Sequence, residues 1–164
     1  MRYWLDADVI INAHNTHYPI GIANKFWLWM DRVVAEGVIV SPKRVFDEVI
    51  KNRKADDSLL IWMHRHKLDG LCIKPTPEVD GIVTEIGDWV FSNPQYPNHQ
   101  RLEFSKGADA WLIAAAEHDK GTVVTNESDK FPNSQRVRIP DVCHHFGVRR
   151  LTMDQLIREI PADF

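Results

Sequence analysis

Near its start the chain reads Arg2-Tyr3-Trp4-Leu5-Asp6-Ala7-Asp8-Val9-Ile10-Ile11. A short apolar run stops at a carboxylate, and apolar residues resume after Asp8 as the start of a helix. In α/β proteins, ligands bind just beyond the carboxyl ends of the strands. Asp6 and Asp8 are therefore candidate site residues. The alternative is that either of them only caps the following helix, as Asp often does.

The composition indicates one globular domain. The chain has 164 residues, of which 44% are hydrophobic and 26% charged, so we expect a single domain over residues 1–164. No apolar run is long enough to cross a bilayer, and Cys72 and Cys143 need no disulfide, so we expect a soluble cytoplasmic protein. A net charge of −3 is not typical of nucleic-acid binders, although cations held by clustered carboxylates would invert the local field.

Hydrophobic spacing predicts strands and helices that alternate along the chain. Strands are expected at residues 3–5, 38–40, 71–73, 122–125 and 137–139. Helices are expected at residues 8–15, 22–36, 43–50, 56–67, 76–92, 107–120, 141–146 and 152–160. Residues 92–106 are expected to be the longest irregular segment. This alternation is typical of an α/β fold with a parallel sheet and helices on both faces.

Carboxylates recur at the strand ends and at the adjacent helix starts. They are Asp6, Glu48, Asp109 and Glu127, with Asp8 and Asp129 nearby. Clustered carboxylates repel one another, and hard cations such as Mg²⁺ or Mn²⁺ relieve that repulsion through oxygen ligands. The same ions activate water and stabilise charge on a phosphoryl group. The sequence has no nucleophile elbow and no glycine-rich phosphate loop that offers another chemistry.

Four segments in a fixed order resemble the PIN domain, and within it a bacterial branch of PIN-like proteins. The segments are Leu5-Asp6-Ala7-Asp8-Val9-Ile10-Ile11-Asn12-Ala13, Val45-Phe46-Asp47-Glu48-Val49, Ala108-Asp109-Ala110-Trp111-Leu112-Ile113-Ala114 and Val123-Val124-Thr125-Asn126-Glu127. Residues 139–146 also look like that branch, so the resemblance covers essentially the whole chain. It implies a three-layer α/β/α sandwich around a parallel sheet of about five strands.

The resemblance also implies an activity, that of a metal-dependent endoribonuclease such as the VapC toxins of bacterial toxin–antitoxin pairs. By position, Asp6, Glu48 and Asp109 match the three principal acids of the family. Glu127 stands where the fourth, more variable acid is found, and Thr125 matches a supporting hydroxyl residue.

Two features of the acid set stay open on sequence alone. Asp8 occupies a position where many members have Asn or Ser, and Asp129 competes with Glu127 for the role of fourth acid. The expected cofactor is Mg²⁺ or Mn²⁺, as one ion or two, with Asp6 and Asp109 as central ligands.

Basic residues near the acids are candidates for holding RNA phosphates. They are Lys51, Arg53, Lys54, Arg101 and Lys106. A toxin would also need a cognate antitoxin protein, for which Trp27 and Trp62 are candidate exposed docking residues. PIN proteins often self-associate, so a homodimer is a further expectation, and no membrane partner is expected.

Three alternatives compete with the nuclease hypothesis. A haloacid-dehalogenase-like phosphatase would use Asp6 as a covalent nucleophile, but residues 125–129 match its later acidic motif poorly and Glu48 and Asp109 would have no role. A PIN-like module that binds RNA or a partner without turnover would keep the acids for metal alone. Histidines 64, 66, 144 and 145 lack the spacing of a four-ligand zinc site.

Overall fold

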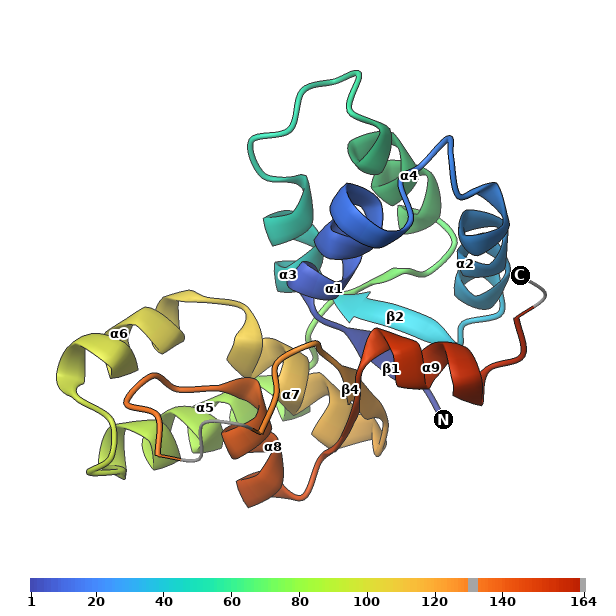
Figure 1. Ribbon diagram of the computed structural model, residues 1–164. Coiled ribbons are helices and arrows are strands. Elements are labelled where there is room, and N and C mark those ends of the chain that lie inside the picture. Colours follow the sequence, from blue (N-terminus) through green and yellow to red (C-terminus); the bar gives the residue numbers. More distant parts are fainter. Residues whose placement is uncertain (130–132, 163–164) are drawn as a thin grey trace.

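The structure is a computed structural model that describes residues 1–129 and 133–162 (Figure 1). Within these residues the strands form one parallel sheet of five strands in the order β3-β2-β1-β4-β5. The strands are β1 (Tyr3–Leu5), β2 (Ile39–Pro42), β3 (Cys72–Ile73), β4 (Thr122–Val124) and β5 (Arg149–Leu151). The expected three-layer α/β/α sandwich with about five parallel strands is therefore confirmed.

Helices cover both faces of this sheet. They are α1 (Ala7–Asn12), continued by a π-helical turn η1 (Ala13–His17), α2 (Asn24–Ala35), α3 (Lys43–Ile50), α4 (Ser58–Lys67), α5 (Pro77–Ser92), α6 (Asn98–Lys106), α7 (Asp109–Asp119), α8 (Ile139–Phe146) and α9 (Met153–Glu159). Figure 1 shows α1 to α4 on one side of the strands and α5 to α8 on the other. Helix α7 packs directly on β1, β2 and β4, and α5 packs on α7 from outside. No helix in the described part of the chain is both long enough and apolar enough to cross a membrane.

Two expected elements are wrong. Residues 137–139 form no strand, because Arg138 is the N-cap of α8 and Pro140 lies in its first turn, where proline is favoured. The fifth strand is Arg149–Leu151 instead, a half-exposed edge strand that pairs with β4. Its two arginines interrupt the apolar run by which a strand is predicted from sequence. Within the expected irregular segment 92–106, residues 98–106 are helical as α6, which buries only Phe104 and so lacks an apolar stripe.

The expectation that Trp27 and Trp62 form an exposed docking surface is also wrong. Their exposed fractions are 5% and 3%, and the two rings meet edge to face at 4.9 Å between centroids. The indole N–H of Trp27 donates to the carbonyl oxygen of Tyr18 at 2.6 Å. That of Trp62 donates to the Asp31 carboxylate at 2.9 Å. Both residues are core residues with satisfied polar atoms.

The order of the strands determines where a site forms. The chain moves outward from β1 through β2 to β3 and then returns to place β4 on the other side of β1. A reversal of this kind opens a crevice at the carboxyl ends of the two strands involved, here β1 and β4. Asp6 follows β1 and Thr125 follows β4, so both lie at this crevice.

At the opposite ends of β1 and β4, side chains next to β1 contact the segment that leads into β4. The Arg2 side chain pairs with Asp119 at 2.7 Å, and the indole N–H of Trp4 donates to the same carboxylate at 3.0 Å. Gly121 lies under this contact. A Cβ atom there would come within 2.7 Å of the Arg2 carbonyl oxygen and 2.9 Å of the Trp4 ring.

We predict that Gly121→Ala lowers the free energy of unfolding by about 1–3 kcal/mol, because the added methyl group meets backbone that cannot move without disturbing β1. Chemical denaturation at equilibrium measures the change. The matched control is Gly81→Ala, an exposed site in α5 with open space at the Cβ position, where alanine should stabilise the helix by up to about 1 kcal/mol. Equal effects of the two substitutions would contradict this account.

Candidate active site

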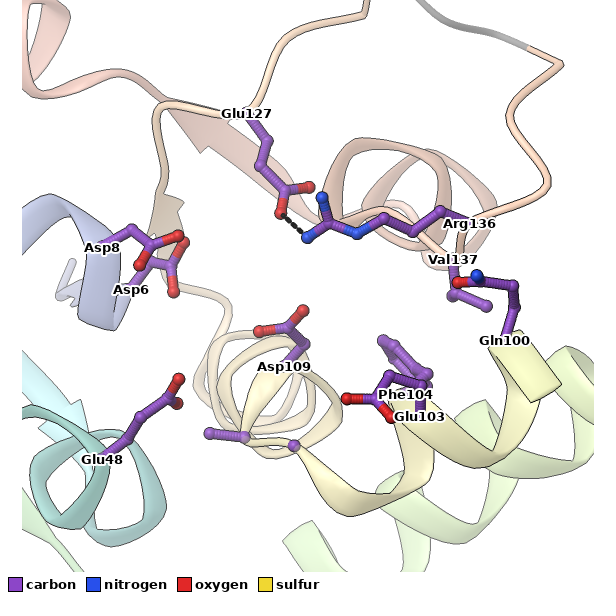
Figure 2. A pocket seen from close by; sticks show the side chains of 12 residues that line it. Asp6, Asp8, Glu48, Gln100, Glu103, Phe104, Asp109, Glu127, Arg136 and Val137 are labelled. Carbon is purple, nitrogen blue, oxygen red and sulfur yellow. Dashed lines mark hydrogen bonds and ion pairs between the residues drawn. The ribbon is translucent and has the colours of Figure 1, made fainter. Parts of the chain in front are cut away.

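Six acidic side chains from five parts of the chain line one pocket of about 230 Å³ (Figure 2), and one of them, Glu103, comes from α6. Asp6 comes from the end of β1 and Asp8 from the first turn of α1. Glu48 lies on α3, Asp109 is the first residue of α7, and Glu127 follows β4. Figure 2 shows the carboxylates of Asp6, Asp8, Glu48 and Asp109 turned toward one another across the open space.

Asp6 is the most buried acid of the group, with an exposed fraction of 6%. Its backbone N–H donates to the Val124 carbonyl oxygen at 3.0 Å, and its carboxylate accepts from the Thr125 hydroxyl at 3.0 Å. Burial, followed by the negative charges of Asp109 and Asp8, raises the pKa of Asp6 to about 8, although the Thr125 hydrogen bond acts in the opposite direction. Asp6 therefore retains its proton near neutral pH unless a cation replaces it.

Asp109 is in a similar position. Burial raises its pKa to about 7, the charges of Glu127 and Glu48 add to the effect, and Arg136 opposes it. The pKa of Glu48 is also raised, first by burial and then by the charge of Asp8. The acids of the pocket thus interact electrostatically, as members of one site.

Glu127 is tied to the protein on two sides. One oxygen of its carboxylate accepts from the backbone N–H of Ile139 at 2.9 Å, at the start of α8, and the other pairs with Arg136 at 3.3 Å (Figure 2). Its own backbone N–H donates to the Thr125 hydroxyl at 3.2 Å. Asp129 lies apart from the pocket: it pairs with Arg150, and 75% of its side chain is exposed.

The pocket suits a cation that keeps part of its water shell. Among the described residues, no three or more His, Cys, Asp or Glu side chains converge closely enough to hold a metal ion by themselves. Mg²⁺ is usually bound through one or two carboxylates with water as the remaining ligands. Buried, mutually repelling carboxylates with raised pKa values offer the oxygen donors and the negative field that such an ion needs.

Several lining residues were missed by the sequence analysis. They are Gln100, Glu103 and Phe104 from α6, with Arg136 and Val137 from the segment before α8. Helix α6 has too few buried residues to show a periodic pattern, and nothing in the sequence around Arg136 distinguishes it from a surface charge.

The five candidate phosphate-binding cations separate into two groups. Lys51 and Lys106 line a cavity of about 430 Å³ beside the acidic pocket, together with Arg44 and Glu48. Glu48 lines both cavities, so these cations lie at the edge of the acidic site.

The other three cations line neither of these two cavities. Arg53 donates to the Val49 carbonyl oxygen at 2.7 Å and pairs with Asp57 at 3.1 Å. Arg101 donates to the Asn93 carbonyl oxygen at 2.7 Å. Lys54 is exposed on the turn after α3.

Comparison with solved structures identifies the fold. One similar chain comes from the crystal structure of VapBC2 from Rickettsia felis bound to a DNA fragment of the VapBC2 promoter. It is 16% identical to this chain, with a TM-score of 0.57. The match covers 93% of this chain and 98% of that one. Another is from FitAB bound to the IR36 DNA fragment, with 14% identity and a TM-score of 0.53 over 92% of this chain and 94% of that one. At these identities the likeness shows the fold alone, which is the PIN-like, VapC-type fold expected from the sequence.

Comparison at the level of sequence gives a family but no characterised relative. No curated protein matches the chain. Residues 3–164 match the family described as "Domain of unknown function (DUF4411)". The chain belongs to this family, and its fold is that of a PIN domain.

Proposed function

We propose that this protein is a metal-dependent endoribonuclease that hydrolyses RNA phosphodiester bonds. The observation that carries the proposal is the acidic pocket at the β1–β4 crevice, where Asp6 and Asp109 have pKa values raised to about 8 and about 7. Burial of like charges close together costs free energy. A divalent cation that also binds a phosphate of the substrate would neutralise part of this negative charge.

The residues of the pocket have distinct roles in this proposal. Asp6 and Asp109 hold Mg²⁺ or Mn²⁺, and Glu48 and Glu127 contact the ion directly or through water. When bound, the ion supplies an activated water and stabilises negative charge on the phosphoryl group. Thr125 fixes the orientation of the Asp6 carboxylate through its hydroxyl hydrogen bond.

Cations beside the pocket attract and orient the substrate. Lys51 and Lys106 lie at its edge, and Arg136 lies inside it, next to Glu127. Hydrolysis joins the oxygen of water to phosphorus and breaks the bond from phosphorus to the leaving ribose oxygen, which takes up a proton. Positive charge near the phosphate counters the charge that builds up in this step.

We further propose that the protein is the toxin of a bacterial toxin–antitoxin pair and acts in the cytoplasm, with an antitoxin protein as its partner. Support comes from the likeness in fold to chains of VapBC2 and FitAB. A PIN-like module that binds RNA without cutting it is the second candidate. It is favoured by one observation, which is that Glu127 is already held by Arg136 and by the start of α8.

We predict that Asp6→Asn and Asp109→Asn each reduce RNA cleavage by more than about 100-fold, because each change removes a charged ligand at nearly constant volume. Cleavage of a mixed RNA pool in Mg²⁺ or Mn²⁺, with an EDTA control, measures this. Asp129→Asn is the matched control and should retain activity, since Asp129 lies outside the pocket. Loss of cleavage in the control alone would refute the assignment. Metal binding without cleavage by the wild type would favour the binding module.

A second prediction concerns stability without metal. A carboxyl whose pKa is raised on folding keeps its proton in the folded state while the unfolded state loses it, so stability falls as pH rises from about 4 to about 8. In EDTA, Asp6→Asn should therefore raise the melting temperature at pH 8 by at least about 2 °C and flatten its decline between pH 5 and 8. Thermal unfolding across this range is the measurement. An unchanged pH slope would show that Asp6 ionises freely.

A third prediction concerns the cations at the edge of the pocket. Lys51→Glu combined with Lys106→Glu should weaken binding of single-stranded RNA and reduce the slope of log affinity against log salt by about 1.4, because two phosphate contacts are lost. Fluorescence anisotropy in EDTA over a salt series measures both quantities. The control pair Lys25→Glu with Arg158→Glu lines neither cavity. If both pairs shift the slope equally, the effect is one of net charge only.

A further inference from the structure

A second cavity, of about 140 Å³, shares no lining residue with the acidic pocket and differs from it in chemistry. Its wall is formed by Trp4, Ile73, Pro75, Val79, Trp111 and Ala115, which are apolar. Basic residues also line it: Arg2 before β1, Lys43 and Arg44 of α3, and Lys74 after β3. The nuclease mechanism proposed above uses none of these residues.

We propose that this cavity is a nucleobase-binding pocket, which takes up one unpaired base of the RNA strand whose backbone crosses the acidic site. The inference rests on the proposed function, because it assigns to that site a contact with its substrate. The occupant is a nucleotide: its planar aromatic base enters the cavity, and its sugar carries a phosphate.

The size and lining of the cavity fit an aromatic ring. A cavity of about 150 Å³ with an apolar lining is large enough for benzene. This one is about 140 Å³ and open to solvent, so the six-membered ring of a base can enter while the rest of the nucleotide stays outside. Trp111 is half-buried in its wall. The Arg44 guanidinium lies 4.5 Å from the centre of the Trp111 ring. Aromatic rings and guanidinium planes are the surfaces on which proteins stack unpaired RNA bases.

The charge around the cavity fits a phosphate. Four Lys or Arg side chains line it, and two of them are paired with acids: Arg2 with Asp119 at 2.7 Å and Lys43 with Asp47 at 2.6 Å. Arg44 and Lys74 form no ion pair with any residue that the structure describes. The rim therefore carries positive charge available to a ligand, in a chain whose net charge is −3.

Shared lining residues connect this cavity, by way of a third one, to the proposed site of cleavage. Arg44 lines both this cavity and the neighbouring one that contains Lys51 and Lys106. Glu48 in turn lines that neighbouring cavity and the acidic pocket. One RNA strand can thus pass from the carboxylates, along the cations, to the aromatic wall. A lipid or an apolar peptide would not need the cations along this path.

Binding of a labelled single-stranded RNA octamer in EDTA tests the proposal without any cleavage. Trp111→Leu keeps an apolar side chain but removes the stacking surface, and it should weaken binding about 5- to 100-fold. Trp111→Phe keeps an aromatic face and should lie between this variant and the wild type. Trp89→Leu is the matched control, because Trp89 is also partly buried but lies in a different cavity, and it should bind as the wild type does.

A second measurement separates base recognition from phosphate binding. In a ¹⁵N spectrum, the indole signal of Trp111 is identified by its loss in Trp111→Leu, and the remaining indole signals report that this variant is folded. Adenosine monophosphate should shift the Trp111 signal, whereas ribose 5-phosphate should not.

Any other outcome contradicts the proposal of a nucleobase pocket. Unchanged RNA affinity in Trp111→Leu, an equal loss in Trp89→Leu, or equal shifts with the two small ligands would overturn it. These results leave the nuclease proposal intact as long as cleavage depends on Asp6 and Asp109. Failure of cleavage in the wild type would instead refute the nuclease while the binding results stand on their own.

Discussion

Repulsion between buried carboxylates at the β1–β4 crevice is the constraint that shapes this molecule. Asp6 and Asp109 have few ways to escape it, because one directly follows a central strand and the other begins the helix that packs on that strand. The start of α7 places partial positive charge near Asp109, and the Thr125 hydroxyl donates to Asp6. The raised pKa values show that these contacts do not offset burial and like charge. The divalent cation of the proposed function would offset this repulsion.

Two aspartates at the same helix position show how environment decides a role. Asp57 is the N-cap of α4 and accepts hydrogen bonds from the backbone N–H groups of Leu59 and Leu60. These hydrogen bonds, together with Arg53, lower the pKa of Asp57. Asp6 is the N-cap residue of α1, but its side chain makes no capping hydrogen bond and its pKa is raised. One carboxylate stabilises a helix, and the other is turned into a pocket. Local sequence alone does not separate the two cases.

The strands and helices that could be predicted from sequence are those whose buried side chains recur at a regular spacing. Strands β1 and β4 and helix α7 lie in the core, so their apolar runs mark them. Strand β5 and helix α6 lie at the periphery: Arg149 is exposed, and α6 buries only Phe104, so neither shows a pattern. The same limit applies to the pocket. Most of its acids could be predicted because they lie on or beside core elements. Glu103 and Arg136 could not, because they come from the peripheral helix α6 and from a loop.

Charge segregation would allow a chain of net charge −3 to bind the polyanionic substrate of the proposed function. Negative charge is concentrated in one pocket, where a divalent cation would reverse its sign. Several other acids are paired within the fold, such as Asp47 with Lys43 and Asp119 with Arg2, so they contribute little field outside it. Arg44, Lys51 and Lys106 line the adjoining cavity. Total charge therefore says little here, because only the unpaired charge along one path reaches a ligand.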